Sequence, residues 1–222
     1  MGDYGKEEVL VIPTNTIIPW EGVKTKNKWQ ILETISQNAF LMLRNEAEGN
    51  PQVTQIIPYC VLSHTDSEGT KRLFHAQRKS EADRELKGKW TIGIGGHINP
   101  EDRVIHSLSK KQKKIMNLDK DLIPTLLACV KRELSEELVC DRKDVMGVGF
   151  ICLLMTKADS VSKDHLGVVL KLEMATRNVN VKPDGELAKG FFATELEFLI
   201  YLDWHDFLLS IHTPEEIKKY GW

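Results

Sequence analysis

The chain has 222 residues and a mass of 25.3 kDa, enough for one sizeable core but short for two independent domains. Its 30 Lys and Arg residues nearly balance 32 Asp and Glu residues, and the net charge of −2 argues against a nucleic-acid partner. No apolar run approaches the roughly 20 residues that span a bilayer, so we expect no membrane segment. Four cysteines without a CxxC pair favour buried, reduced thiols and a cytoplasmic location.

The first 50 residues are predicted to form an extension. Extended pieces are expected at Val9–Pro13 and Thr16–Pro19, followed by a helix over Lys28–Glu46. The apolar positions on one side of this helix are Ile31, Ile35, Phe40 and Leu43. Because that side must be buried, the extension is expected to cover the sheet or to build a homodimer, and we favour the homodimer. We therefore divide the chain into an extension, residues 1–52, and a domain, residues 53–222.

The remaining pattern predicts an α+β fold. Gln55–Ser63 and Lys71–Arg78 are typical of a strand hairpin, and Trp90–Ile94 of a short strand. Further strands are expected at Val145–Met155, Leu166–Ala175 and Gly190–Phe192, with helical segments at Thr194–Leu199 and Trp204–Ile211. Because strands and helices mix without regular βαβ alternation, a sandwich with a mixed sheet is favoured.

The strongest helix pattern covers Asp121–Leu138. Its expected buried face consists of Leu127, Val130, Leu134 and Leu138. Positions three and four apart are neighbours on a helix, so Glu133, Glu136 and Glu137 place three carboxylates on one face. Their repulsion costs roughly 0.2–0.5 kcal/mol per pair, and a hard cation would reverse its sign. The alternative is a solvated helix face on which Arg132 pairs with Glu136.

The run Thr91-Ile92-Gly93-Ile94-Gly95-Gly96-His97-Ile98 is rich in glycine, and the predicted strand Trp90–Ile94 leads into a turn at Gly95-Gly96. Without side chains, a backbone can approach a ligand closely or offer a carbonyl to a cation. The alternative is a tight bend with no ligand.

Together these residues resemble the Nudix (MutT-like) hydrolases. Their box reads Gly-x5-Glu-x7-Arg-Glu-U-x-Glu-Glu-x-Gly-U, where U is aliphatic, and it commonly follows a strand ending in Gly-Gly-His. Gly95-Gly96-His97 matches the start, and the run from Arg132 to Glu137 matches the Arg-Glu-U-x-Glu-Glu segment at every position. The resemblance covers roughly residues 55–211 and implies a Nudix-type α/β/α sandwich with a mixed sheet.

The chain departs from the box in three ways. The box places its Arg 14 positions after the glycine, whereas Arg132 follows Gly96 by 36, an insertion of 22 residues at about 100–120. The first Glu of the box, which in the family orients the Arg, has no secure equivalent. Its candidate substitutes are Glu101, Asp102 and Asp121. Val139 and Cys140 replace the closing Gly-U. The insertion carries Lys110, Lys111, Lys113 and Lys114, which either guide polyphosphate or face solvent.

The resemblance implies a role for each matching residue. Glu136 and Glu137 are expected to bind Mg²⁺ or Mn²⁺, with Glu133 as a further ligand or the base and the carbonyl of Gly96 as another ligand. Arg132 is expected to be structural. A later Glu completes many Nudix sites, and Glu186 is our candidate, with Asp184 equally near in sequence and Glu173 weaker. The residues expected to bind substrate are Arg78, Gly95, Gly96 and His97.

The resulting hypothesis is metal-dependent hydrolysis of a diphosphate linkage in a nucleoside diphosphate derivative, by attack of water on phosphorus. A non-catalytic Nudix-like module that senses a nucleotide or binds a protein stays open, because the box is split. Isopentenyl diphosphate isomerases share the fold, but their chemistry usually needs a catalytic Cys, and no Cys lies beside the glycine turn in the sequence.

Overall fold

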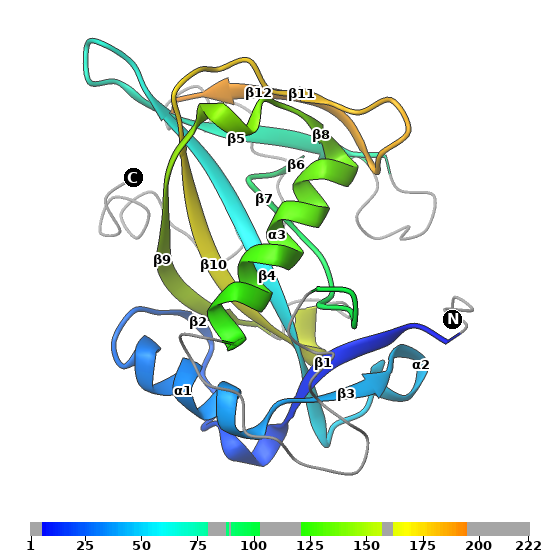
Figure 1. Ribbon diagram of the computed structural model, residues 1–222. Coiled ribbons are helices and arrows are strands. Elements are labelled where there is room, and N and C mark those ends of the chain that lie inside the picture. The colour runs from blue at the N-terminus through cyan, green and yellow to red at the C-terminus, as the bar shows by residue number, and fades with distance from the viewer. Residues whose placement is uncertain (1–5, 80–87, 89, 103–120, 157–161, 195–222) are drawn as a thin grey trace. The chain divides into compact units, whose positions relative to one another are not determined.

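The structure is a computed structural model that describes residues 6–79, 88, 90–102, 121–156 and 162–194 (Figure 1). Its contacts divide the chain into two compact units. Unit 1 takes the described residues within 1–58, 95–132 and 152–168, and unit 2 those within 59–94, 133–151 and 169–222. Several long elements contribute residues to both units.

Unit 1 is built around strand β1 (Glu8–Pro13). One edge of β1 pairs antiparallel with β3 (Phe40–Leu43), and the other pairs with the start of β4 (Val53–Thr65). A second antiparallel pair joins β2 (Gly22–Lys24) to the last residues of β9 (Val145–Met155). The predicted strands at residues 9–13 and 145–155 are therefore confirmed.

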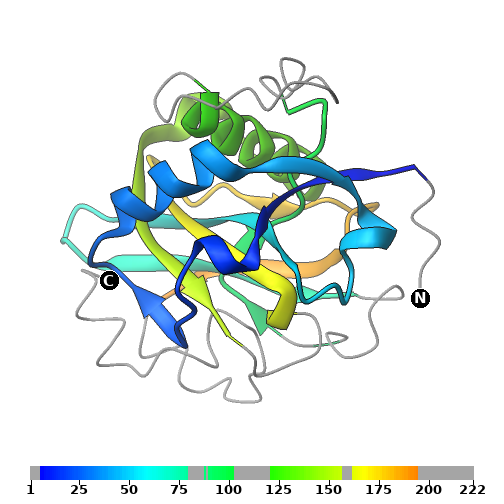
Figure 2. The ribbon, with the colours of Figure 1, turned by 90° about the horizontal axis from the view of Figure 1, so that it is seen from below.

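The helix expected over Lys28–Glu46 is wrong in its second half. Helix α1 ends at Asn38 and is followed by β3 and by the short helix α2 (Arg44–Ala47), as Figure 2 shows. The reason is that Phe40 and Met42 pack against a buried cluster formed by Val9, Val11, Ala47 and Val53. An alternating, strand-like arrangement serves that contact better than a helical one. The strand expected at residues 16–19 is also absent, because a 3₁₀ turn (Thr14–Thr16) precedes an irregular segment.

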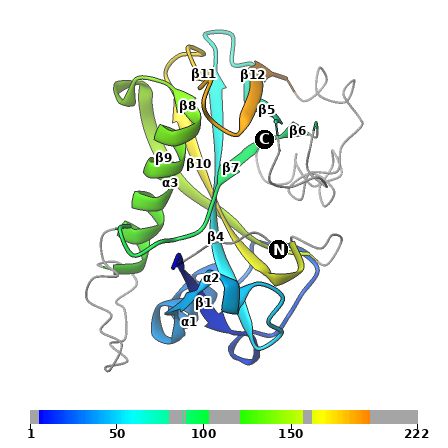
Figure 3. The ribbon, with the colours of Figure 1, turned by 90° about the vertical axis from the view of Figure 1, so that its right-hand side faces the viewer.

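Unit 2 contains β5 (Lys71–Arg78), which lies between the end of β4 and β12 (Leu187–Ala193) in antiparallel pairing. The short strand β6 (Trp90–Thr91) also pairs with β5. Strand β10 (His165–Met174) neighbours β4, and the Ser63 hydroxyl donates to the Leu172 carbonyl at 3.3 Å. A separate pair joins β8 (Leu138–Val139) to β11 (Asn180–Val181), visible in Figure 3. The predicted α+β class with a mixed sheet is confirmed.

Helix α3 (Ile123–Glu137) confirms the strongest predicted helix but corrects its buried face. Leu126 and Cys129 are almost fully buried, whereas Leu127 is 37% exposed. The burial of Val130, Leu134 and Leu138 agrees with the prediction. The apolar stripe is therefore rotated slightly from the expected one.

Two sets of expectations lie outside the described residues: the lysine-rich insertion, and the helical segments at 194–199 and 204–211 apart from Thr194. In the part of the chain that the structure describes, no helix is long and apolar enough to cross a membrane. All four cysteines are free thiols; Cys60, Cys129 and Cys152 are buried as expected, and Cys140 is half-buried.

Candidate active site

The Cys129 thiol contacts the glycine turn of unit 1. Strand β7 (Gly93–Gly95) leads into Gly96 and His97, and Cys129 lies on α3 next to them. Its Sγ is 3.8 Å from the Gly96 carbonyl oxygen and 3.4 Å from that of His97. No cysteine lies beside this turn in the sequence, but α3 brings Cys129 into contact with it in space. This thiol is fully buried and donates to backbone carbonyls, which makes it a packing group.

Arg132 binds the same turn through the His97 carbonyl and Asp102, and we call this set of contacts the arginine clamp. Its Nη2 donates to the His97 carbonyl at 2.8 Å and to Oδ2 of Asp102 at 2.9 Å, while its Nε donates to Oδ1 of Asp102 at 3.1 Å. Asp102 is only 3% exposed, and its Oδ2 also accepts the backbone N–H of Asn99 at 2.9 Å. Asp102 thus orients the arginine, as expected of one of the three candidate substitutes. Two parallel hydrogen bonds make this a bidentate pair of high geometric specificity.

His97 is neutral in this environment. Burial is the main cause that lowers its pKa well below 6.5, and electrostatic interactions with Arg44, His165 and Arg132 lower it further. Its ring meets that of His165 edge-on, with 5.6 Å between centroids. Nε2 of His97 is shielded from solvent and has no hydrogen-bond partner among the described residues. A neutral imidazole of this kind can accept or donate a hydrogen bond to a ligand.

In unit 2 the carboxylate of Glu137, at the end of α3, meets the start of β12. Its two oxygens accept the backbone N–H of Glu186 at 3.1 and 2.9 Å, and Oε2 accepts that of Leu187 at 3.2 Å. Burial is the largest influence on the pKa of Glu137 and raises it, and the negative charge of Glu186 acts in the same direction. The N–H groups and the charge of Arg78 oppose this rise without cancelling it.

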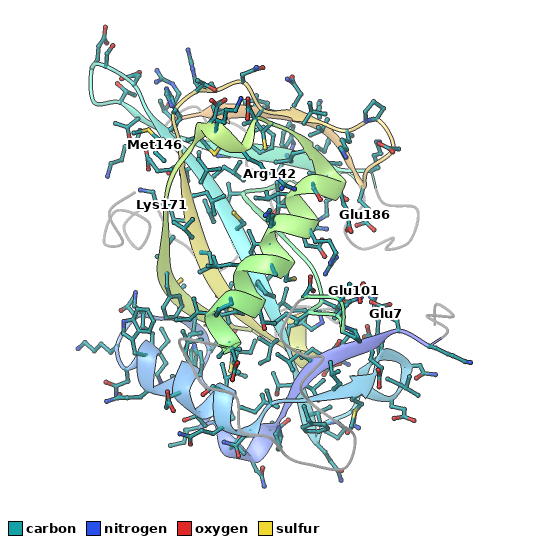
Figure 4. All side chains as sticks on the ribbon, viewed as in Figure 1. Glu7, Glu101, Arg142, Met146, Lys171 and Glu186 are labelled. Atoms are coloured by element: carbon teal, nitrogen blue, oxygen red, sulfur yellow. The ribbon has the colours of Figure 1, made fainter. Side chains whose placement is uncertain are left out.

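The turn that carries Glu186 is tied down on both sides. The Lys79 ammonium donates to the carbonyls of Pro183 at 2.6 Å and Gly185 at 2.9 Å, and the Lys79 N–H donates to the Glu186 carbonyl at 2.7 Å. Lys182 donates its backbone N–H to the Glu137 carbonyl at 2.8 Å and its ammonium to the Ser135 carbonyl. Figure 4 shows Glu186 beside the end of α3.

The other predicted residues of unit 2 differ in their surroundings. Arg78 is paired across the sheet with Leu187, and its Nε is shielded from solvent without a hydrogen-bond partner among the described residues. Glu136 is exposed and Glu133 is half-buried. Glu173 is engaged by Ser63 at 2.7 Å and Lys171 at 3.0 Å, which gives it a structural role in the sheet. The structure therefore brings together Arg78, Glu137 and Glu186.

No protein-family model matches the chain. Protein YmaB of Bacillus subtilis (strain 168) is 24% identical over 190 residues, which cover 82% of this chain and 83% of YmaB. The crystal structure of Tm1382, a candidate Nudix hydrolase, superposes with a TM-score of 0.68 at 20% identity and covers 97% of this chain and 99% of its own.

A second structure is the NUDIX domain of Shewanella oneidensis NrtR in complex with ADP ribose. It has a TM-score of 0.51 at 14% identity and covers 82% of this chain and all of that domain. The chain has a Nudix fold. The fold expected from the split box is thereby confirmed.

The donor chemistry of α3 suits a hard divalent cation, because Glu133, Glu136 and Glu137 offer carboxylate oxygens. Among the described residues, however, no three His, Cys, Asp or Glu side chains converge on one point. The carboxylates of α3 therefore fit Mg²⁺ or Mn²⁺ in ligand type.

Two residues that contact the candidate site were not found from the sequence. Lys79 directly follows Arg78, but nothing in the local pattern indicates that its ammonium reaches a turn more than 100 residues away. Cys129 lies more than 30 residues after the glycine turn in the sequence, and nothing in the local pattern indicates that the two are in contact. Both contacts are tertiary, so a periodicity argument does not reach them.

Proposed function

We propose that this protein is a Nudix-type pyrophosphohydrolase that cleaves a diphosphate linkage in a nucleoside diphosphate derivative. The observation that supports the proposal is the arginine clamp, the contact of Arg132 with Asp102 and the His97 carbonyl, which holds the glycine turn although the box is split. Arg132 binds Asp102 and the His97 carbonyl, and the next residue of the helix begins the run of three glutamates. Such a run repels itself unless a cation compensates it.

The chain's own residues would have distinct tasks. Glu136 and Glu137 would hold the cation together with the Gly96 carbonyl, and Glu133 would be a further ligand or the base that takes the proton from the attacking water. Glu186, held by the Glu137 carboxylate through its backbone, would complete the acidic group. The Arg78 guanidinium, the backbone of Gly95 and Gly96, and the neutral His97 ring would bind and orient the diphosphate.

A bound Mg²⁺ or Mn²⁺ would neutralise phosphate oxygens and lower the pKa of a water molecule aligned for in-line attack. Positioning and charge compensation supply most of the catalysis in phosphoryl transfer, so no covalent intermediate on the protein is required. The ADP ribose in the complex of the NrtR Nudix domain supports a nucleoside diphosphate derivative as the substrate class.

The test is a substrate panel of nucleotide sugars, ADP-ribose, dinucleoside polyphosphates and nucleoside triphosphates, each with Mg²⁺ or Mn²⁺. We expect metal-dependent release of phosphate-containing products, and Glu136→Gln and Glu137→Gln to lower kcat by orders of magnitude with the fold retained. Full activity in either variant contradicts the assigned roles. Glu46→Gln, which removes a carboxylate from α2, is the matched control.

A non-catalytic nucleotide-sensing or protein-binding module is the second candidate. It is favoured by one observation: the Glu137 carboxylate already accepts hydrogen bonds from two backbone N–H groups, those of Glu186 and Leu187. Nucleotide binding without turnover, unaffected by Mn²⁺, identifies this alternative.

The compartment and the assembly are further parts of the proposal. Four free thiols suit a reducing cytoplasm. Residues 1–52 are proposed as an extension of the catalytic domain that builds a homodimer. Sedimentation of the full chain tests this, because a monomer at all concentrations contradicts it.

A further inference from the structure

A hydrogen-bonded bridge in unit 1 connects the residues before β1 to the loop after the glycine turn. Oε2 of Glu7 pairs with Nη1 of Arg44 at 3.0 Å, and the Glu7 carbonyl accepts the Arg44 N–H at 2.8 Å. The other carboxylate oxygen of Glu7, Oε1, accepts Nδ2 of Asn99 at 3.4 Å. One carboxylate thus joins α2 to the loop, and Figure 4 shows Glu7 beside the loop that carries Glu101.

From Asn99 the bridge continues to the arginine clamp. The Asn99 N–H donates to Oδ2 of Asp102 at 2.9 Å, and the same oxygen accepts Nη2 of Arg132, also at 2.9 Å. That Nη2 donates onward to the His97 carbonyl at 2.8 Å. Linked hydrogen bonds of this kind polarise and restrain one another, so a change at one end is felt at the other.

A backbone contact runs beside the bridge and fixes its register. The N–H of Leu10 in β1 donates to the carbonyl of Ile98 at 3.0 Å, one residue after His97. The Glu7 and Arg44 side chains are 24% and 21% exposed, so their ion pair is partly shielded from water. Arg44 has a second partner, Glu48, at 3.3 Å and one helical turn away. Arg44 therefore keeps an ionic partner when the Glu7 charge is removed.

We propose that Glu7 is a positioning residue of the candidate active site, which holds the glycine turn through Asn99, Asp102 and Arg132. The turn presents the carbonyls of Gly96 and His97, so the N-terminal residues form part of the frame of the site. The inference depends on the proposed function only in taking the Gly96 carbonyl as a metal ligand.

The test compares Glu7→Gln with Glu48→Gln in the full chain. Both variants remove one carboxylate charge from Arg44, but only Glu7 reaches Asn99. Amide hydrogen exchange of Asn99, in metal-free buffer, is expected to accelerate about 3- to 10-fold in Glu7→Gln and to stay unchanged in Glu48→Gln. The Mn²⁺ affinity measured by calorimetry is expected to fall by a similar factor of about 3 to 10 in Glu7→Gln only.

The two readouts separate this inference from the proposed function. Equal exchange of Asn99 in both variants overturns it, whatever the activity. Faster exchange with unchanged Mn²⁺ affinity overturns the link to the metal site. If the wild type neither binds Mn²⁺ nor turns over any substrate, the proposed function fails, and exchange alone decides whether Glu7 holds the turn. Equal unfolding midpoints of the two variants serve as the control for a general loss of stability.

Discussion

Replacing Asp102 by Asn tests the clamp that organises the glycine turn. The Asp102 carboxylate is 3% exposed and receives three hydrogen bonds, two from the Arg132 guanidinium and one from the Asn99 N–H. Asn is nearly the same size but carries no charge, and its NH₂ group turns a donor toward donors. Removing one partner of a buried ion pair costs about 3–5 kcal/mol, and since Arg132 is 22% exposed we take about 3 kcal/mol.

Urea unfolding at pH 7 measures this loss. With a slope of about 2–3 kcal/mol per M, a loss of about 3 kcal/mol lowers the midpoint by about 1–1.5 M. Glu101→Gln is the matched control, because it removes the same charge from an exposed neighbour and is expected to change stability by less than about 0.5 kcal/mol. Equal midpoints for Asp102→Asn and Glu101→Gln refute the reasoning. Arg132→Lys is expected to resemble Asp102→Asn, since an ammonium cannot reproduce the bidentate geometry.

Three further predictions concern the turn before β12 and the core of unit 2. Burial raises the pKa of Glu137 above 4.5, so the folded state binds the carboxyl proton of Glu137 more tightly than the unfolded chain does. The stability that protonation of Glu137 contributes is present at low pH and is lost as pH rises through the raised pKa. Urea unfolding in EDTA at several pH values is expected to show this decline in the wild type and a flatter profile in Glu137→Gln; parallel profiles contradict it. Lys79→Met removes two hydrogen bonds to the turn that carries Glu186 and is expected to lower kcat about tenfold with little change in KM. Lys131→Met, on the exposed side of α3, is the control and is expected to leave kcat and KM unchanged. Equal kinetics of the two variants argue against a positioning role for Lys79. Gly190→Ala places a Cβ 2.3 Å from Cζ of the buried Phe74 and is expected to lower the free energy of unfolding by about 1–3 kcal/mol. Gly147→Ala, whose Cβ has no atom within 4 Å, is expected to leave thermal unfolding unchanged. Unchanged thermal unfolding of Gly190→Ala contradicts the packing described.

The parts of the fold that were predicted correctly are those with a strong local pattern. Val145–Met155 is a strand with the expected bounds, since its apolar and β-branched residues define it locally. Lys71–Arg78 also has the expected bounds, since a turn-like segment precedes it. The segment at Phe40–Leu43 was assigned to a helix, because its apolar residues continue the helical spacing of α1. Only the tertiary contact with the cluster around Val9 and Val11 makes it a strand.

The candidate site divides in the same way. The acidic run on α3 and the glycine turn were recognised from their order in the chain. Asp102 could be proposed as one of three acidic residues, but choosing it required the distance to Arg132. The contacts of Lys79 and Cys129 involve residues brought together by the fold alone. The roles of the site residues and the division into residues 1–52 and 53–222 stay predictions.

The separation of Asp102 and Arg132 along the chain bears on how this fold tolerates added sequence. The two partners are 30 residues apart, whereas the unbroken box separates its acid and arginine by eight positions. Loop-closure entropy grows only with the logarithm of length, so the longer connection costs about 1 kcal/mol more. This entropic cost is smaller than the loss of stability of roughly 3 kcal/mol that we expect when the Asp102–Arg132 ion pair is broken. The long connection in this chain therefore does not prevent the Asp102–Arg132 ion pair from forming.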